Sequence, residues 1–347
     1  MEIFEEMGEN EHEQLVFWCD KSAGYRGLIA IHDTTLGPAL GGTRFWNYSS
    51  DSEAVTDVLR LSRGMTYKAA ITGLALGGGK SVIIGDNRTT ERELLFRAHG
   101  RAIESLKGRY IAAEDVGTSV DDMEFVRMET DSVAGLRGGS GDPSPITAFG
   151  VYRGVKACAQ FRYGDCSLRG KHVTVQGLGH VGYYLCKYLH SDGARLTVAD
   201  IDDGRVARVV QEFGAEAVGA RDVVAVDADI FAPCALGGVI NDDTLNDLQV
   251  DIVAGAANNQ LSEARHGQVM HERGVVYAPD YVINAGGLCS VYGELHGWTA
   301  ERTEKKAGAI YDTLLGIFER AANDGISTSD AADRLARQWI MRARGLE

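Results

Sequence analysis

Residues 172–203 read HVTVQGLGHVGYYLCKYLHSDGARLTVADIDD and carry a specific pattern. The triplet Gly177-x-Gly179-x-x-Gly182 follows a β-branched run, and a segment with helical spacing of apolar residues comes after it. A second strand-like run then ends at Asp200, eighteen residues past Gly182. A strand, a glycine turn, a helix and a second strand with an acidic end are the parts of a dinucleotide-binding βαβ unit.

Each part of this unit has a physical reason. Gly177 allows the tight turn, Gly179 lets the backbone approach a pyrophosphate, and Gly182 lets the helix pack closely on the strand. The helix N-terminus offers amide donors and the positive end of the helix dipole to the phosphates. The alternative is a strand–helix turn whose glycines serve packing alone. We expect the whole loop to contact the cofactor, namely Gly177, Leu178, Gly179, His180, Val181 and Gly182.

The acidic end of the second strand indicates which dinucleotide is bound. The carboxylate of Asp200 can accept hydrogen bonds from both ribose hydroxyls. Asp202 and Asp203 stand beside it, and Arg195 is expected on the far side of the strand. A 2′-phosphate would therefore meet repulsion, and the sequence predicts NAD as the cofactor rather than NADP.

The rest of the second half predicts a parallel sheet wrapped by helices, because strands and helices alternate beyond residue 150. The expected strands read HVTVQG, RLTVAD, DIFAP, DIVAG and VVYAPD. Two further helices, near residues 303–323 and 329–344, end the chain.

A domain boundary is expected in the segment RGGSGDPSPITAFG, residues 137–150, because it is rich in Gly, Ser and Pro. We therefore predict an α/β chain with two domains, residues 1–140 and 141–324. The helical part from about residue 325 to residue 347 can pack back on the first domain.

The first domain also predicts a mixture of strands and helices. LVFWCD and RGLIAIHD flank DKSAGY in the manner of an antiparallel hairpin. SDSEAVTDVLRLSRGM predicts a helix with Ser50 and Glu53 as a capping box and with Met65 among the apolar residues along one side. Later segments predict a helix around ERELLFRAHGRAIESL, a strand RYIAA and a helix near VDDMEFVRME.

Residues 73–81, GLALGGGKS, look like a phosphate-binding loop, but spacing and context both exclude an NTPase. The pattern G-x-x-x-x-G-K-[ST] needs a glycine at position 74, where this chain has Leu74. The run after Lys80 predicts a strand, whereas a phosphate site needs a helix N-terminus there. We expect these glycines instead to let the backbone pass close to a small ligand and to place Lys80 in a cleft poor in water.

The composition narrows the classes of function. The chain has 347 residues, 44% of them hydrophobic and 24% charged, with a net charge of −14. This acidic balance argues against a nucleic-acid groove or an anionic membrane surface, since both favour Lys/Arg clusters. No apolar run approaches the roughly 18 residues of a membrane span, and the acidic N-terminus does not predict a signal peptide.

Cysteine and histidine usage predicts a cytoplasmic protein without a metal. Six scattered cysteines without a C-x-x-C pattern fit reduced, buried thiols. His266 and His271 are five residues apart and lack an H-E-x-x-H context, so no structural or catalytic metal is predicted.

Three charged residues at the ends of expected elements are candidates for acid–base chemistry: Lys68, Lys80 and Asp115. A lysine that loses its aqueous surroundings has a lowered pKa and becomes a usable base near neutral pH. Asp115 follows the strand RYIAA, where open α/β sheets place functional groups. Its rival Glu114 should leave the strand on the other face. The alternative is that these are ordinary solvated surface charges.

The chain also contains the stretches TTLGPALGGTR, RGMTYK, GLALGGGKSVIIGD, AAEDVGTSVDDM, GDPSPITAFGVYRG, FAPCALGG, AGAANNQL and YAPDYVINAGG. From about residue 3 to residue 335 it resembles the amino-acid dehydrogenases of the glutamate/leucine/phenylalanine/valine group. The resemblance implies an N-terminal substrate domain, a C-terminal Rossmann domain that binds NAD, and a cleft between them. It also implies reversible oxidative deamination of an L-amino acid to a 2-oxo acid and ammonia, in a homo-oligomer that is usually an octamer.

Matched position by position, the resemblance assigns roles to residues of this chain. Lys80 is the base that activates water, and Asp115 shuttles protons to and from the amino group. Lys68 binds the substrate carboxylate, helped by the backbone at Gly41 and Gly42. The residues implied at the cofactor are Asn258, which also reaches the substrate, Thr147 at the nicotinamide carboxamide, and Ala232, Pro233 and Cys234 in the wall of the site.

The positions that match the family's side-chain pocket are all apolar: Leu40, Met65, Ala113, Leu288 and Val291. A glutamate side chain would need a cation there, since an unpaired buried carboxylate is costly. Branched-chain aliphatic substrates, leucine with isoleucine and valine, are therefore expected. Two residues depart from the group, because Leu288 often aligns with valine and Gly182 with alanine. The alternatives are a phenylalanine- or valine-preferring enzyme of the same group, or a non-catalytic NAD-binding sensor.

Overall fold

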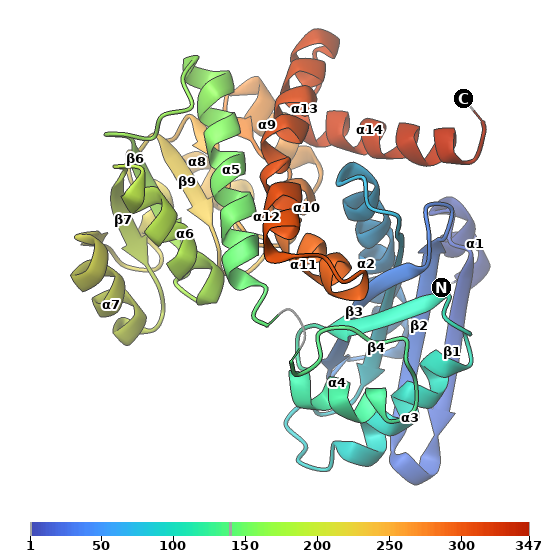
Figure 1. Ribbon diagram of the computed structural model, residues 1–347. Coiled ribbons are helices and arrows are strands. Elements are labelled where there is room, and N and C mark those ends of the chain that lie inside the picture. Colours follow the sequence, from blue (N-terminus) through green and yellow to red (C-terminus); the bar gives the residue numbers. More distant parts are fainter. Residues whose placement is uncertain (1, 139–140, 347) are drawn as a thin grey trace. The chain divides into compact units, whose positions relative to one another are not determined.

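The computed structural model describes residues 2–138 and 141–346. These form two compact units (Figure 1). The first unit comprises Met1–Gly141, Glu294–Gly297 and Ala336–Glu347, and the second comprises Asp142–Gly293 and Trp298–Leu335. The chain passes between them inside the segment 137–150, of which residues 139 and 140 lie outside the described residues.

The first unit is built on a five-stranded mixed sheet with the order β1-β2-β4-β3-β5. β1 pairs antiparallel with β2, which confirms the predicted hairpin, and β2 pairs antiparallel with β4. β3 runs parallel to both β4 and β5. The strands are β1 (Gln14–Asp20), β2 (Tyr25–Asp33), β3 (Ala39–Trp46), β4 (Gly77–Ile84) and β5 (Tyr110–Glu114). Sequence analysis misses β3, since its two central glycines weaken the strand pattern.

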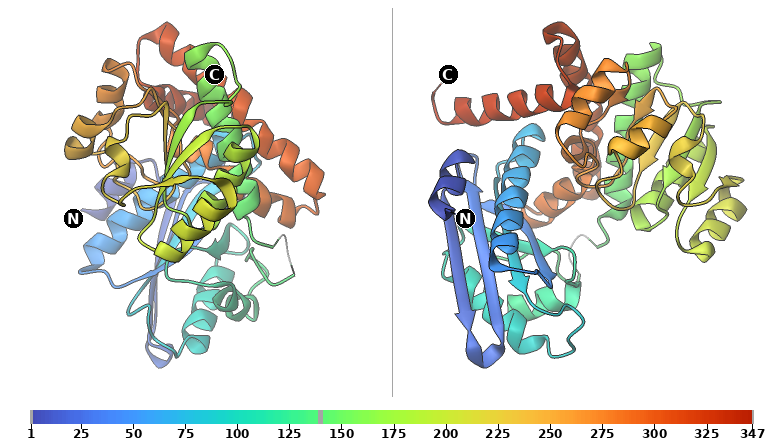
Figure 2. Two further views of the ribbon diagram at one scale, coloured as in Figure 1. Left: turned by 90° about the vertical axis from the view of Figure 1, so that its left-hand side faces the viewer. Right: turned by 180° about the vertical axis from the view of Figure 1, so that it is seen from behind.

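Helices cover both faces of this sheet, as the views in Figure 2 show. α2 (Asp51–Ile71) packs on one face through Val55, Val58 and Leu59. α3 (Glu93–Glu104) and α4 (Val120–Arg127) pack on the other. A short helix α1 (Ile3–Glu9) and a 3-10 turn (Lys21–Ala23) complete the N-terminal part.

The predicted helix is confirmed as α2, which continues beyond Met65 to Ile71. No helix-breaking residue follows Met65 until Gly73, whose φ of +59° suits a left-handed turn. Half of the predicted capping box is present, since the Ser50 side chain accepts the Glu53 N–H. The other half differs, because the Glu53 carboxylate accepts the N–H of Ser49 and not that of Ser50.

The three glycines of β4 are required by close packing within the protein. A Cβ on Gly78 would lie 2.1 Å from the Thr66 amide nitrogen of α2, and one on Gly79 would lie 2.7 Å from the ring of Tyr110. A Cβ on Gly77 would meet the carbonyl oxygen of Asp33 at 2.1 Å. These glycines therefore admit a helix backbone, an aromatic ring and a neighbouring loop, and the approach of a ligand to this backbone stays a prediction.

The second unit holds a six-stranded sheet with the order β11-β10-β9-β6-β7-β8, and every pair is parallel. This confirms the predicted α/β architecture with a parallel, doubly wound sheet. The strands are β6 (His172–Gln176), β7 (Arg195–Ala199), β8 (Glu216–Ala217), β9 (Ile230–Pro233), β10 (Ile252–Val253) and β11 (Val276–Tyr277).

Helices surround this sheet (Figure 1). α8 (Asp242–Asp247) and α9 (Arg265–Glu272) share a buried cluster with Phe231 and Tyr277 of the strands. The other helices of the unit are α5 (Ser144–Tyr163), α6 (His180–Ser191), α7 (Asp203–Phe213), a 3-10 turn (Val223–Ala225), α10 (Asp280–Ile283), α11 (Gly286–Leu295), α12 (Ala300–Gly308) and α13 (Ile310–Asp324).

Two predictions for this half need correction. The helix expected over residues 303–323 is two helices, α12 and α13, interrupted at Ala309 directly after Gly308, a residue of low helix propensity. The segment 137–150 is not wholly a linker, because α5 begins at Ser144 with Pro145 in its first turn, a position that proline favours.

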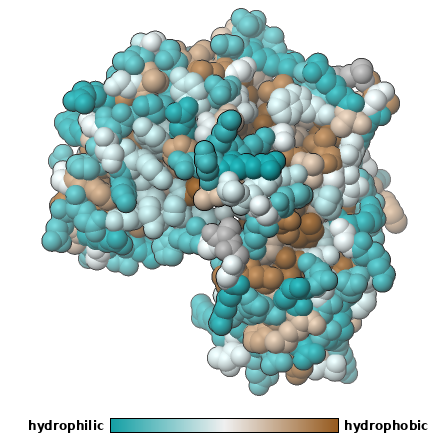
Figure 3. Space-filling view, in the orientation of Figure 1, coloured by the Kyte–Doolittle hydropathy of each residue, from teal (hydrophilic) through white to brown (hydrophobic). Residues whose placement is uncertain are grey.

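The last helix, α14 (Thr328–Ala343), contributes its C-terminal half to the first unit. There Arg337 donates to the Tyr67 hydroxyl over 2.7 Å, and Arg344 pairs with Asp33. The surface visible in Figure 3 is mostly hydrophilic. Across residues 2–138 and 141–346, no helix is both long and apolar enough to cross a membrane.

Candidate active site

An ion pair between a buried lysine and a partly buried aspartate lies in the first unit. The Lys80 ammonium is 2.7 Å from the Asp115 carboxylate, and the Lys80 side chain is only 7% exposed. Lys80 sits within β4, and Asp115 follows the last residue of β5. The two candidates from sequence analysis are therefore in direct contact.

The surroundings of this pair lower the pKa of both groups. Burial lowers the pKa of Lys80, and the negative charge of Asp115 opposes this only in part. Burial alone would raise the pKa of Asp115, but the charges of Lys80 and Arg44 outweigh it, so that pKa lies below its usual value. The ammonium can therefore release a proton more readily than an exposed lysine.

Arg44, which sequence reasoning missed, also contacts Asp115. Its Nε lies 3.2 Å from Asp115 Oδ2, and its Nη1 lies 2.9 Å from Asp57 Oδ2. The only available signal was its place at the end of the stretch TTLGPALGGTR, where it was not singled out. Its partner Asp57 is thirteen residues away on another element, so no local pattern could indicate the pair.

The backbone next to the ion pair comes from β3. Gly42 pairs with Ala113 of β5, and a Cβ on Gly42 would lie 2.7 Å from Asp115 Cβ and 3.3 Å from Lys80 Nζ. Any side chain there would displace the pair. Gly41 packs against the carbonyl of Gly79, and its own carbonyl accepts the hydroxyl of Tyr110 over 2.7 Å.

The other substrate residues predicted in this unit lie on neighbouring elements. Leu40 is buried on β3, paired with Gly78 of β4. Met65 and Lys68 are partly buried on α2, the helix whose backbone lies against Gly78. Glu114, the rival of Asp115, is exposed.

In the second unit the glycine loop has the geometry that a dinucleotide needs. Gly177 has a φ of +93°, and a Cβ there would lie 2.8 Å from Ala235. A Cβ on Gly182 would lie 2.0 Å from the Gly177 carbonyl oxygen, so this glycine permits the close approach of α6. No described atom lies within 4 Å of a Cβ on Gly179, which caps α6. This open backbone at a helix N-terminus fits a pyrophosphate.

Asp200 has a structural role that sequence analysis did not predict. Its carboxylate accepts the Leu178 N–H over 2.6 Å and the Asp202 N–H over 2.9 Å, and its side chain is 6% exposed. It therefore fixes the glycine loop. Arg205, which sequence analysis overlooked, lies 3.9 Å from Asp200 and 3.5 Å from Asp202. That cation weakens the repulsion expected for a 2′-phosphate.

The remaining loop residues differ in exposure. Leu178 is buried, whereas His180 is exposed and lies 3.3 Å from Asp142. Val181 is partly buried in the first turn of α6.

The predicted cofactor wall lies at the carboxyl ends of neighbouring strands. Ala232 and Pro233 end β9, and Cys234 donates its N–H to the Gln176 carbonyl at the end of β6 over 2.7 Å. Burial raises the pKa of the Cys234 thiol to about 12, so it is no nucleophile at neutral pH. Thr147 is on α5, where its Oγ1 donates to the Pro143 carbonyl over 2.9 Å.

Asn258 is exposed and accepts a hydrogen bond from Asn284, another residue that sequence reasoning missed. The Asn284 amide nitrogen is 2.7 Å from Asn258 Oδ1 and 3.1 Å from the Ala256 carbonyl. Its own Oδ1 is buried without a hydrogen-bond partner among the described residues. Its place in YAPDYVINAGG, directly before α11, was the available signal. Leu288, buried, and Val291, partly buried, follow on α11.

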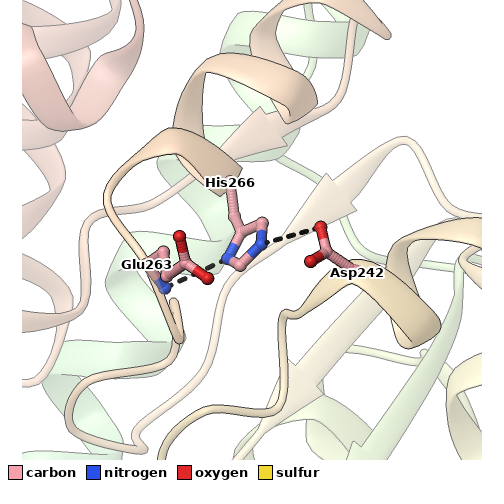
Figure 4. A group of neighbouring side chains, drawn as sticks. All are labelled: Asp242, Glu263 and His266. Atoms are coloured by element: carbon pink, nitrogen blue, oxygen red, sulfur yellow. Dashed lines mark hydrogen bonds and ion pairs between the residues drawn. The ribbon is translucent and has the colours of Figure 1, made fainter.

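Asp242, Glu263 and His266 form the single group of three possible metal ligands among the described residues (Figure 4). His266 Nδ1 accepts the Glu263 N–H over 3.1 Å, and Nε2 is 3.3 Å from Asp242. Arg265 pairs with both carboxylates. Both ring nitrogens are thus engaged and the carboxylates are already neutralised, which disfavours a cation there.

Two family models match the chain. One, described as Glu/Leu/Phe/Val dehydrogenase, dimerisation domain, matches residues 12–132, and one described as Glutamate/Leucine/Phenylalanine/Valine dehydrogenase matches residues 138–208 and 198–344. The chain belongs to the glutamate/leucine/phenylalanine/valine dehydrogenase family. It is an amino-acid dehydrogenase of a family that uses NAD or NADP.

Individual relatives match over nearly the full length. The chain is 56% identical over 347 residues to leucine dehydrogenase of Geobacillus stearothermophilus, covering 99% of this chain and 95% of the relative. It is 48% identical over 340 residues to valine dehydrogenase of Streptomyces coelicolor, covering 96% and 93%. The crystal structure of L-tryptophan dehydrogenase from Nostoc punctiforme superposes with a TM-score of 0.88 at 46% identity, covering 98% and 99%.

Proposed function

We propose that this family member catalyses the NAD-dependent, reversible oxidative deamination of branched-chain aliphatic L-amino acids, with L-leucine as the principal substrate. The observation that carries the proposal is the Lys80–Asp115 pair, 2.7 Å apart and flanked by Gly42. Its support comes from the 56% identical relative, a leucine dehydrogenase.

In the proposed reaction the first unit holds the amino acid and moves its protons. Hydride leaves Cα only from a neutral amine, so Asp115 accepts the ammonium proton of the substrate. Lys68, as a cation, binds the substrate carboxylate. Lys80, in its neutral form, takes the proton of the water that attacks the iminium carbon and becomes an ammonium beside the new hydroxyl. Asp115 then returns its proton to the nitrogen, which leaves as ammonia as the carbonyl of the 2-oxo acid forms and the hydroxyl proton is released.

The second unit is proposed to hold NAD, which when bound accepts the hydride from Cα. The loop from Gly177 to Gly182 binds the pyrophosphate through its amides. Thr147 contacts the carboxamide, Ala232, Pro233 and Cys234 line the site, and Asn258 holds the substrate amine by a neutral hydrogen bond.

NAD is proposed over NADP because of the local charge. Asp200, Asp202 and Asp203 place three carboxylates near the expected ribose, against the single cation of Arg205. The net negative charge disfavours a 2′-phosphate. Asp200 can accept ribose hydroxyls while it holds the Leu178 amide, since a carboxylate has about four acceptor positions.

The preference for an aliphatic side chain is attributed to Leu40, Met65, Ala113, Leu288 and Val291, none of which can compensate a charge. A valine-preferring enzyme is the alternative that the valine dehydrogenase relative favours, and the L-tryptophan dehydrogenase structure shows that an aromatic substrate belongs in the test. One methylene in a hydrophobic pocket changes discrimination by only about 1–3 kcal/mol.

The test follows NADH absorbance with a panel of L-amino acids at alkaline pH, with NADP in parallel. We expect the highest kcat/KM with leucine, then isoleucine and valine, and little turnover with glutamate or with NADP. Absence of turnover with every aliphatic amino acid would contradict the proposal and favour a non-catalytic NAD-binding sensor.

We further propose that residues 1–140 form the substrate-binding and oligomerisation domain and residues 141–324 the NAD-binding domain, with residues from about 325 to 347 associated with the former. A homo-oligomer is expected, an octamer in particular, in the cytoplasm. Light scattering after size-exclusion chromatography tests the assembly: a mass near eight chains supports the octamer, and a monomer contradicts it.

A further inference from the structure

Arg44 lies between two carboxylates, and one of these belongs to the proposed catalytic pair. Its Nε contacts Asp115 Oδ2 at 3.2 Å, and its Nη1 contacts Asp57 Oδ2 at 2.9 Å. Asp57 also accepts the Tyr48 hydroxyl over 2.8 Å and pairs with Arg60 over 3.1 Å. Lys80, Asp115, Arg44 and Asp57 therefore form a continuous chain of alternating charges.

The chain of charges results from the way β3 and α2 face β4. Val82 of β4 packs against α2, and Lys80, two residues earlier, points to the same face. Arg44 of β3 pairs directly with Val82, so its side chain lies beside Lys80 on that face. Asp57 is presented from α2, which covers the same face.

Burial strengthens the electrostatic interactions among these charged side chains. The side chains of Arg44 and Asp57 are 21% and 15% exposed, and that of Lys80 is 7% exposed. Charges within a few ångströms of each other interact several-fold more strongly in such a setting than in water. The surface pair Arg26–Asp51, by contrast, has side chains that are 56% and 69% exposed.

We propose that Arg44 and Asp57 are positioning residues, which hold the Asp115 carboxylate and set the balance of charge around Lys80. This inference rests on the proposed function for the roles of Lys80 and Asp115, but not for the contacts themselves.

The two residues act on Lys80 in opposite directions. The positive charge of Arg44 favours the neutral amine and lowers the pKa of Lys80, whereas the negative charge of Asp57 raises it. Burial would raise the pKa of Asp57, but the Tyr48 hydrogen bond and the charge of Arg44 outweigh it, so this carboxyl is ionised at neutral pH. Arg44 thus offsets the charge of Asp115, which alone would keep Lys80 protonated.

The charged and titratable groups on this face of the sheet, and their partners, are few. β2 contributes His32, whose ring nitrogens form hydrogen bonds with the Thr66 hydroxyl and the Asn10 carbonyl. Burial lowers the pKa of His32 to about 4, so this residue is neutral at the pH of the assay. Other charged or titratable groups here include His12, whose ring lies 4.7 Å from that of His32 and whose pKa burial lowers, and Arg63 of α2. The groups closer to Lys80 are Asp115 directly after β5, Arg44 from β3, Tyr48 after β3, and Asp57, Arg60 and Lys68 from α2.

The experiment compares Arg44→Gln with Asp57→Asn in the full-length enzyme. As Lys80 must be neutral to act as a base, kcat/KM rises with pH through its pKa. Arg44→Gln moves this limb to higher pH and lowers kcat/KM on the acid side roughly tenfold, whereas Asp57→Asn moves the limb to lower pH. NAD affinity stays unchanged in both. Arg26→Gln removes an exposed arginine of the same unit and serves as the control with an unchanged profile.

Opposite displacements support the inference, because a merely structural defect would lower the rate without moving the limb. Displacement of both limbs in the same direction, or of neither, overturns it. If Arg44→Gln does not fold, Arg44→Lys and Asp57→Asn test the inference instead. In Arg44→Lys the rise of kcat/KM with pH should stay near that of the wild type, and in Asp57→Asn it should move to lower pH.

A pocket of about 600 Å³ permits a chemical rescue. Arg44, Tyr48 and Asp57 line it, so a guanidinium ion can enter beside the site vacated in Arg44→Gln. Added guanidinium at millimolar concentration should restore part of the lost kcat/KM, and sodium at equal ionic strength should not. Equal effects of the two cations overturn a specific role for Arg44.

A second readout does not depend on amino-acid turnover. Competitive labelling with acetic anhydride across a pH series, with mass spectrometry of the peptide that carries Lys80, measures the pH at which this amine becomes neutral. The midpoint should rise in Arg44→Gln and fall in Asp57→Asn. If the wild type turned over no amino acid, the proposed function would fail while this labelling would still decide the inference. Unchanged midpoints would overturn it.

Discussion

The two glycine-rich segments of this chain look alike in sequence and do opposite things in the structure. In β4 the glycines at positions 77–79 admit other parts of the protein, and Gly78 lies against the α2 backbone. In the loop before α6, Gly177 takes a positive φ and Gly179 leaves open space. The secondary structure around each segment makes the difference: a strand buries its glycines on both sides, whereas a helix N-terminus leaves amides free for an anion.

The largest effect is expected from the lysine that ends the first segment. Lys80→Ala removes the proposed base, and we expect kcat to fall about 10³-fold, the usual scale for loss of a general base. Steady-state assays with L-leucine and NAD measure this. Turnover within tenfold of the wild type would show that another group is the base.

Gly78→Ala should destabilise the first unit through a steric clash between β4 and α2. The new Cβ would lie 2.1 Å from the Thr66 amide nitrogen and 2.6 Å from the Ser62 carbonyl, so α2 must move. We expect the free energy of unfolding to drop by about 3 kcal/mol, at the upper end for overpacked cores. Urea denaturation measures it, with Gly64→Ala, where a Cβ meets open space, as the matched control. A loss equal to that of the control would mean that α2 does not press on Gly78.

The pH dependence of kcat/KM tests whether Lys80, at the end of the first glycine segment, acts as a base. Burial lowers the pKa of Lys80, so the neutral base should appear below the pH expected for an exposed lysine. On the acid side of that pKa, kcat/KM should rise about tenfold per pH unit as the proton is lost, and then level off. A profile that falls as pH rises across this range would contradict a neutral lysine as the base.

Gly179→Ala should weaken NAD binding with little change in stability, whereas Gly78→Ala should lower stability. Gly179 has a φ of −62°, which alanine adopts, and no described atom lies near the new Cβ. Stability should change by less than about 0.5 kcal/mol. The methyl group stands where the pyrophosphate approaches, so we expect NAD to bind roughly tenfold more weakly in calorimetric titration. Unchanged affinity would mean that the phosphates lie elsewhere.

The sequence predicts those features that local patterns encode. The strand, glycine turn and helix at residues 172–191 are confirmed because their periodicity and spacing need no distant partner. The hairpin of β1 and β2 is confirmed for the same reason. β3 was missed because its glycines hide the strand period, although it supplies Gly41, Gly42 and Arg44 to the site.

The features that the sequence could not predict depend on contacts between distant segments. The Arg44–Asp57 pair joins a strand to a helix, and the Asn258–Asn284 hydrogen bond joins residues 26 positions apart. The role of Gly78 depends on where α2 packs. The assigned functions of Lys80, Asp115 and the cofactor residues stay predictions that the experiments above test.

One titration tests most directly whether the two glycine segments divide the work as proposed. NAD is titrated into Lys80→Ala and into the wild type, in the absence of substrate, by calorimetry. Our account predicts a Kd for NAD within about twofold of the wild type, because the phosphates bind at Gly177–Gly182 and not at Lys80. A tenfold or greater loss of NAD affinity in Lys80→Ala would contradict it.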